Sequence, residues 1–561
     1  MKKILNRYTV TCLLLLLTAD SCTKNFGDIN SSPSVVNKPD VKFLLSYVED
    51  KIITYQGTEW VWESMEQLMR FTQHVTSSPY EITNNVNTRY NTYYLDILPN
   101  LFEIRRQADL MPAKEQYQKV KMVTYILQVM HGIKVTDMNG SIPYSQAIEG
   151  RYDSKYSPVY DQQQPLFDNW LSQLNDAIKT LSNASVTNQV DYGKSDIFYQ
   201  SDWIKWVKLA NTLKLRIAAR LENTDKTKCQ AIFQQVLQDA TGPIDGDAAQ
   251  VKYMNLYTPF GNSGDIDYRS RRYATTSIMQ FLKNSNDPRL PIYFQQNDLV
   301  GSYKDTLAKY NVSLPAFIDP NDPLISYQGG PADWTTNPTV AAYISNSLIV
   351  SQYTKYFLIS AINRRFFSPK LNQATGNFLD VSVTYAETCF YIAEFIQKGY
   401  AGAVDTKGTA ADWYKKGITS SIQTMNTIAI AAGSTTGFTG TGETEINNYL
   451  NNPVVKFNGV NDLERIYIQQ YLGLYRQPNE AYVFCRRTGY PKTGSAYYAR
   501  ETFNELIPRR FWLTDPGEVN RTNWMAAMQQ QGFTPNAQDI TTLSSQRVWY
   551  DKAAPDFGKG N

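Results

Sequence analysis

The pattern that governs this chain is clearest in the stretch WIKWVKLANTLKLRIAARL, which occupies residues 203–221. Its apolar side chains recur at the three- and four-residue spacing of one helix face. Lys205, Lys208 and Lys214 fall on other faces and keep such a helix soluble. The preceding segment repeats this spacing with Phe167, Trp170, Leu171, Leu174, Ile178 and Leu181. Both stretches therefore predict long amphipathic helices.

Working outward, the helical pattern covers most of residues 41–221. It returns in three later segments, at 385–398, 411–425 and 463–475. Helix and connection alternate at roughly forty-residue spacing, which is typical of stacked helix pairs. Gly, Pro, Asp and Asn recur through 241–370, where short helices are predicted only near 277–283 and 340–351. We therefore predict a mainly α fold, a degenerate TPR-like helical-repeat scaffold (an α–α superhelix) with a large loop-rich insert that carries the ligand site.

The domain organisation follows from these shifts in composition. Residues 1–21 are interpreted as a signal peptide, and 22–40 as a lipidated cysteine with its tether. A single domain is expected to cover 41–561. Within it we distinguish three parts, a helical half at 41–240, the insert at 241–370 and a helical and irregular part at 371–561.

The N-terminus has the pattern of an export signal. Basic residues near the start precede an apolar run centred on Leu13 to Leu17, which is too short to span a bilayer. The run ends at Thr18-Ala19-Asp20-Ser21-Cys22, similar to a bacterial lipoprotein cleavage site. We predict that Cys22 is lipidated, since two acyl chains give stable anchoring. The alternative is a plain secretory signal with a chance cysteine.

Composition excludes several function classes. The 561 residues carry 55 Lys and Arg against 52 Asp and Glu, so the basic stripe of a nucleic-acid binder is not expected. His74 and His131 are the only imidazoles, which excludes a histidine-rich metal cage. We interpret both as ordinary residues, with His131 at the C-terminal end of a helix where a cation suits the dipole. Cys389 and Cys485, in apolar helical stretches, are expected to be buried.

The usual catalytic signatures GxxxxGK[ST], HExxH and GxSxG do not occur. Asp265 and Asp267 could form the carboxylate pair of a glycoside hydrolase, but adjacent arginines favour surface salt bridges. Asp319 and Asp322 could help to hold Ca²⁺, although they lack the twelve-residue loop pattern of such sites. We therefore predict no catalytic residue, no cofactor and no metal ligand.

Aromatic residues in polar loops are the remaining candidates. A flat ring can pack on the C–H face of a sugar while neighbouring polar groups bond its hydroxyls, and such sites also suit peptides. The predicted ligand-binding residues are Trp60, Trp62, Tyr268, Arg269, Tyr327 and Trp334.

Several segments, in order along the chain, resemble the SusD/RagB-type lipoproteins of Bacteroidetes. They are Cys22 to Asn30, Asp137 to Ala147, Ser157 to Gln163, Trp203 to Leu221, Tyr385 to Glu387, Trp413 to Ile418, Gln469 to Tyr471, Arg486 to Pro491, Pro508 to Arg510 and Arg547 to Asp551. The turns and caps in these segments have a plain structural interpretation. Asp161 is a natural N-cap for the next helix, and Arg216 and Arg220 share one helix face from which they can reach carboxylates or carbonyls.

The resemblance implies a nutrient-binding lipoprotein of the cell outer membrane, anchored by lipid and facing outward. In such a system the protein would bind oligosaccharide or polysaccharide as a lid and deliver it to a SusC-like TonB-dependent transporter, without catalysis. The alternatives are a RagB-like peptide-binding lipoprotein of an import complex and, from a different class, a lipid-anchored glycoside hydrolase. The resemblance transfers no single binding residue, because the ligand contacts of the family lie in variable loops.

Overall fold

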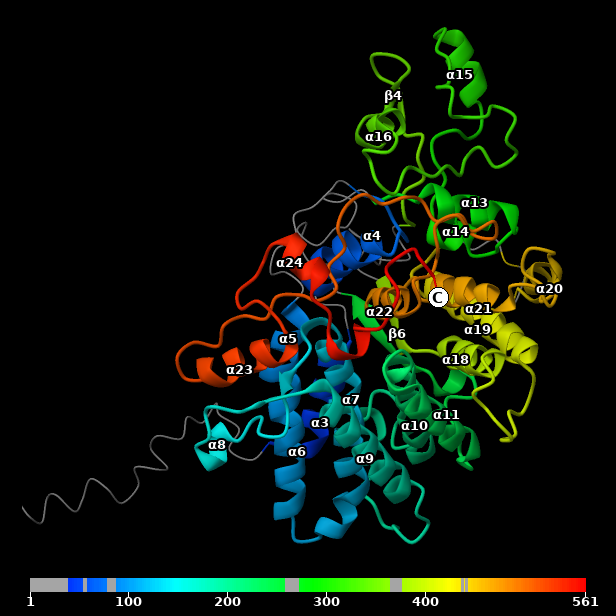
Figure 1. Cartoon of the computed structure of the whole chain (residues 1–561). Helices are drawn as coiled ribbons and strands as arrows, with labels where there is room; N and C mark the ends of the chain where they lie inside the picture. Colours follow the sequence, from blue (N-terminus) through cyan, green and yellow to red (C-terminus); the bar gives the residue numbers. More distant parts are fainter. Residues whose placement is uncertain are drawn as a thin grey trace, which may run out of the picture.

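The computed structural model describes residues 39–53, 58–77, 87–257, 272–363, 376–434, 438 and 442–560. Figure 1 shows long helices of the N-terminal half side by side in its lower part, with the insert, in green, at the top. Most of the C-terminal helices, in yellow and light orange, lie between these two regions on the right, and the orange-red and red ones lie at the left.

Six long helices are described in the N-terminal half. They are α3 (Val41–Ile52), α6 (Leu98–Leu110), α7 (Gln118–Asn139), α9 (Gln163–Leu181), α10 (Trp203–Leu221) and α11 (Lys226–Gln238). From α6 onward each helix packs on the next in this series, so the half is a stack of helix pairs. Residues 203–221 form α10, as predicted, and Phe167, Trp170 and Leu174 of α9 are buried in the shared core.

Short elements connect these helices. Two have π-helical hydrogen bonding, η1 (Thr58–Leu68) and η3 (Tyr93–Ile97). The others in this half are α4 (Met69–Phe71), α5 (Thr88–Thr92), η4 (Lys114–Tyr117), β1 (Ile142–Pro143), α8 (Gly150–Asp153), β2 (Tyr160–Asp161), η5 (Gly193–Ser195) and η6 (Asp247–Ala249).

The helix caps follow the expected chemistry with one correction. Asp202 accepts the backbone N–H of Lys205 at the start of α10. Asp161, predicted as the N-cap of α9, lies one residue too early, and Gln162 takes that position. The carboxylate of Asp161 instead accepts the backbone N–H groups of Tyr144 and Ser145, each at 2.9 Å, and ties the turn that follows β1 to β2.

The chain enters and leaves the insert through one antiparallel ribbon of β3 (Val251–Tyr257) and β6 (Gly376–Val383). Between them lie α13 (Thr276–Asn284), α14 (Leu290–Tyr293), α15 (Tyr303–Lys309), α16 (Pro338–Ser345), β4 (Leu348–Ile349) and β5 (Lys355–Tyr356). The helix predicted near 340–351 ends at Ser345 because the chain becomes extended at Asn346 and then pairs as the β4–β5 hairpin.

The C-terminal part returns to helix. Its elements are α18 (Tyr385–Gln397), α19 (Ala410–Ala431), α20 (Glu443–Asn451), α21 (Asp462–Gly473), α22 (Pro478–Thr488), α23 (Arg521–Gln531), α24 (Ile540–Ser545) and η7 (Trp549–Asp551). Contacts between α10 and α18 join the two helical parts, and one hydrophobic core runs through both. Cys389 and Cys485 are buried, as predicted.

The prediction of a mainly α scaffold with few strands is confirmed. The predicted position of His131 at the end of a helix is wrong. Helix α7 continues to Asn139, so His131 lies in the helix interior and is buried. Burial lowers its pKa to about 3, so the side chain is neutral and does not act as a cation for the helix dipole. Among the described helices, none has the length and apolar character needed to cross a bilayer.

Candidate functional site

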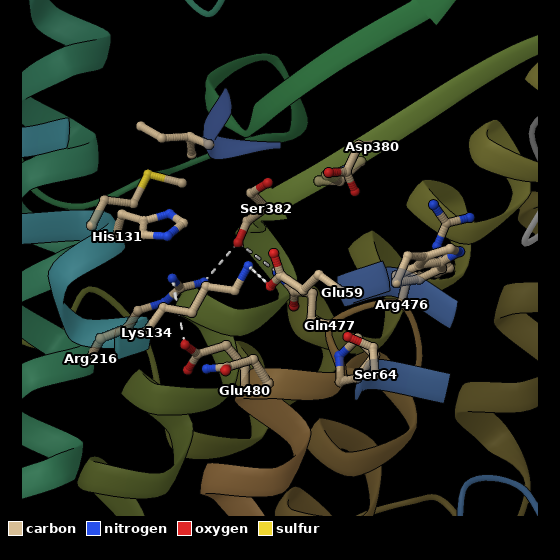
Figure 2. A pocket seen from close by; sticks show the side chains of 16 residues that line it. Glu59, Ser64, His131, Lys134, Arg216, Asp380, Ser382, Arg476, Gln477 and Glu480 are labelled. Atoms are coloured by element: carbon tan, nitrogen blue, oxygen red, sulfur yellow. Dashed lines mark hydrogen bonds and ion pairs between the residues drawn. The ribbon is translucent and has the colours of Figure 1, made fainter. Parts of the chain in front are cut away.

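The described part of the chain has several hollows, including one of about 820 Å³ along α23. Two others, one enclosed and one in the insert, differ in size and enclosure. The first is a buried cavity of about 60 Å³ where η1, α7, α10, β6 and α22 meet, shown in Figure 2. Ligand pockets for small molecules usually measure about 300–1,000 Å³, whereas one water occupies about 30 Å³ of liquid. This cavity therefore has room for a few waters and none for a sugar ring.

Its walls are held by ion pairs between distant segments. Lys134 contacts Glu59, and Arg216 lies 3.7 Å from Glu480 and donates to the carbonyl of Ser382 at 2.8 Å (Figure 2). The pairs of Lys134 with Glu59 and of Arg216 with Glu480 place opposite charges together in the cavity wall, as buried ions require. This cluster thus joins the helical half to β6 and α22 and is structural.

The second hollow is an open groove of about 620 Å³ in the insert, lined by α13, the segment 317–337, α16 and Glu501. Figure 1 shows α16 above α13 in the green region. The volume lies in the range of ligand sites. Polar side chains predominate on its walls, with Met279, Phe317 and Val340 adding apolar surface. We take this groove as the candidate functional site.

An ion pair forms one wall of the groove. Lys283, near the end of α13, contacts Asp322 and also donates to the carbonyl oxygen of Tyr327 at 3.0 Å. Gln328 donates to the same Asp322 oxygen at 3.1 Å, and the backbone N–H of Leu324 donates to the other at 2.8 Å. Partial burial opposes ionisation, but these donors hold the pKa of Asp322 below its usual range.

Glu501 closes the other end of the groove. One carboxylate oxygen accepts the backbone N–H of Ser277 at 3.2 Å, in the first turn of α13, and the other accepts that of Ala332 at 2.9 Å. Burial raises the pKa of this carboxyl, and the backbone donors oppose that rise. Its position at a helix N-terminus suits a carboxylate.

A glycine allows the groove wall to approach α13 closely. A Cβ at Gly329 would lie 2.6 Å from the carbonyl oxygen of Thr275, which no side chain tolerates. The backbone N–H of Thr276 donates to the carbonyl of Gly330 at 2.8 Å, so the two segments are fastened together. The sequence signal for this contact was Gln328-Gly329-Gly330-Pro331.

Two of the aromatic residues predicted from sequence neighbour groove residues along the chain, although neither ring lines the groove. Tyr327 precedes Gln328, and Trp334 lies between the groove residues Pro331 and Thr336; both rings are half-buried. The Trp334 indole N–H donates to the Thr76 hydroxyl at 2.9 Å. Its segment is fixed by Asp333, which accepts backbone N–H groups from Thr335 and Asn504 at 2.9 Å each.

The other predicted residues are placed elsewhere. Trp60 is only 4% exposed and lines the enclosed cavity, where the Arg476 guanidinium lies 5.1 Å from its ring centroid. Trp62 is half-buried on η1 and does not line the groove. Tyr268, Arg269 and Cys22 lie outside the described residues, as does the pair Asp265 and Asp267.

Sequence reasoning missed the polar residues of the groove. Gln280, Lys283, Asn284 and Asn337 line it, yet each is an ordinary surface residue in sequence, and only the fold brings α13 and α16 together. As for metals, the described residues contain no group of three His, Cys, Asp or Glu side chains arranged to hold an ion. Asp322, considered above for Ca²⁺, is engaged with Lys283.

Comparison with solved structures supports the fold. A chitin-binding protein matches with a TM-score of 0.68 and 22% identity, over 91% of this chain and 100% of its own. A SusD homologue from Bacteroides fragilis gives 0.64 and 22%, over 92% and 99%. A chitin-binding SusD homologue from Flavobacterium johnsoniae gives 0.62 and 18%, also over 92% and 99%.

Comparison with curated proteins gives no match. The family model of SusD-like proteins, described as starch-binding and associating with the outer membrane, matches residues 33–513. This match covers most of the chain and includes the helical scaffold, the ribbon and the groove. The chain therefore belongs to the SusD-like family.

Proposed function

We propose that this protein binds oligosaccharide at the cell surface, in the groove between α13 and α16, and hands it to a SusC-like TonB-dependent transporter without cleaving it. A lipid on Cys22 would hold it at the outer membrane. The observation that carries the proposal is the groove itself, whose volume and mixture of amide and apolar side chains suit a sugar chain.

The family supports a glycan as the ligand, and two structural neighbours are described as chitin-binding. At about 20% identity these neighbours show the fold alone and do not identify the ligand. Their descriptions nevertheless make chitin oligosaccharides the first ligand to test. The ion pairs of the enclosed cavity support the non-catalytic part of the proposal, because Glu59 and Glu480 are each paired with a cation in its wall.

The test is isothermal titration calorimetry of the mature chain against chitin, starch, xylan and mannan oligosaccharides, with mixed tri- to pentapeptides in parallel. We expect saturable binding of at least one glycan, and weaker binding when Gln328 is replaced by Ala. Binding of peptides and of no glycan would instead establish the RagB-like alternative. Release of new reducing ends from any polymer would contradict the non-catalytic role.

Transfer to the transporter needs its own test. We expect the lipidated protein to co-purify with a TonB-dependent transporter from detergent-solubilised outer membranes. Recovery of the protein without such a transporter, under conditions that preserve other outer-membrane complexes, would contradict the delivery step.

A further inference from the structure

We infer that the groove selects uncharged sugars over acidic ones, and that the ion pair of Lys283 with Asp322 sets this preference. The inference rests on the proposed function, since it names the class of glycan that the same groove accepts. It concerns the charged side chains among the described residues that line the groove, which are Lys283, Asp322 and Glu501.

The cation is already committed to partners within the protein. Lys283 and Asp322 are 16% and 19% exposed, so both lie largely in the wall. The ammonium donates to the carboxylate and to the carbonyl of Tyr327, at 3.0 Å for the latter. A uronate or sulfate could pair with Lys283 only by drawing it away from Asp322, which would leave a partly buried carboxylate without its counter-ion.

The two carboxylates are also occupied. Both oxygens of Asp322 and both oxygens of Glu501 accept hydrogen bonds from the protein, as described above. An acidic sugar in the groove would therefore meet an internally neutralised ion pair and, beyond it, the carboxyl group of Glu501. Like charges brought together at a binding site cost affinity and thereby exclude the wrong ligand.

Amide side chains supply the groups suited to neutral sugars. Gln280 and Asn284 are exposed and one turn apart on α13, facing the groove. Asn337 uses its carbonyl oxygen to cap α16 through the N–H of Val340 at 3.2 Å, which directs its NH₂ group to other acceptors. An amide both donates and accepts, as a sugar hydroxyl does, and it binds without a net charge.

The test uses a glycan microarray with neutral, amino, uronate and sulfated oligosaccharides, probed with the mature chain and with D322N. We expect the wild-type protein to prefer neutral glycans. D322N frees Lys283 and should raise the ratio of acidic to neutral binding at least tenfold, and the gain should fall as NaCl rises from 50 to 500 mM. The double variant D322N/K283Q lacks this freed cation and should show no gain.

D245N is the matched control. Asp245 pairs with Lys208 of α10 at 2.7 Å, outside the groove, so this change alters the net charge equally and should leave the ratio unchanged. Circular dichroism confirms folding of each variant. A wild-type preference for acidic glycans, or an unchanged ratio in folded D322N, overturns the inference while glycan binding stands. Binding of no glycan by any of the proteins overturns the proposed function and the inference with it.

Discussion

The guanidinium of Arg216 donates two hydrogen bonds to the carboxylate of Glu387, from Nε to Oε1 at 2.6 Å and from Nη2 to Oε2 at 2.8 Å. The two residues lie 171 positions apart, on α10 and in the first turn of α18. Both side chains are buried, at 5% and 0% exposure. This bidentate pair therefore fixes the N-terminal helices to the C-terminal ones.

We expect E387Q to destabilise the protein strongly, because the buried Arg216 would lose its bidentate carboxylate and keep only the longer contact to Glu480. Breaking a buried pair on one side costs about 3–5 kcal/mol. Urea unfolding followed by circular dichroism measures the change. The surface pair of Glu149 with Lys155 at 2.8 Å provides the control, and E149Q should leave the unfolding midpoint unchanged. Equal midpoints for E387Q and E149Q would contradict this structural role.

Gly417 should be intolerant of any side chain. A Cβ at this helical position would lie 2.7 Å from Cε1 of Phe390, where α19 packs on α18. G417A gains about 1 kcal/mol of helix propensity, but overpacking costs about 1–3 kcal/mol, so we expect net destabilisation. The double variant G417A/F390L should recover part of the loss, because Leu leaves room for the methyl group. Absence of any recovery would show that Phe390 is not the obstacle.

His74 should make the stability depend on pH. Burial lowers its pKa to about 3 in the folded protein, against about 6.5 in the unfolded chain. The ring N–H donates to the carbonyl of Tyr471 at 2.8 Å, so Nδ1 accepts from Thr72. Below pH 6.5 only the unfolded chain takes up the proton. The contribution of His74 to the free energy of unfolding is therefore complete above pH 6.5 and is lost as the pH falls toward 3.

Urea unfolding at several pH values between 6 and 4.5 tests this dependence. The free energy of unfolding should fall less steeply in H74Q than in wild type, by about 1.4 kcal/mol per pH unit, which corresponds to one proton. Comparing slopes cancels the other titrating groups, including His131 with its similarly lowered pKa. Parallel slopes would mean that His74 is protonated in the folded state.

Trp334 should contribute to glycan binding. We expect W334A to weaken binding at least tenfold, or about 1.4 kcal/mol, through loss of the half-buried ring beside the groove. W334F keeps a ring but loses the hydrogen bond to Thr76, so its affinity for the glycan should lie between those of the wild type and W334A. Calorimetry with the best glycan of the panel measures both. W62A is the comparison, and an equal loss there would place the ligand at η1 instead of the groove.

Lipidation of Cys22 should decide where the protein resides. We expect C22S to move the protein from the outer-membrane fraction to the soluble fraction, because two acyl chains provide stable anchoring. Cell fractionation with labelling by a palmitate analogue tests this. Retention of C22S in the membrane fraction, or absence of label on wild type, would favour the plain secretory signal.

The sequence by itself predicted the helices well, because their apolar spacing is a local property. The α10 stretch and the segments of α9, α18 and α21 were located from their helical pattern. Local chemistry predicted less where the tertiary structure competes with it. The helix predicted to reach 351 ends at Ser345, and a β-hairpin follows it. Asp161 accepts hydrogen bonds from the turn after β1 instead of capping α9.

For the candidate site, the sequence alone determined that aromatic rings occur in a polar insert, since composition is visible without a structure. It did not separate Trp334 from Trp60, because burial depends on segments far away in the chain. Only the tertiary structure placed Trp60 beneath Arg476 and brought Lys283 of α13 against Asp322. A groove is formed by contacts between distant segments, and a spacing rule that reads neighbours along the chain contains no information about them.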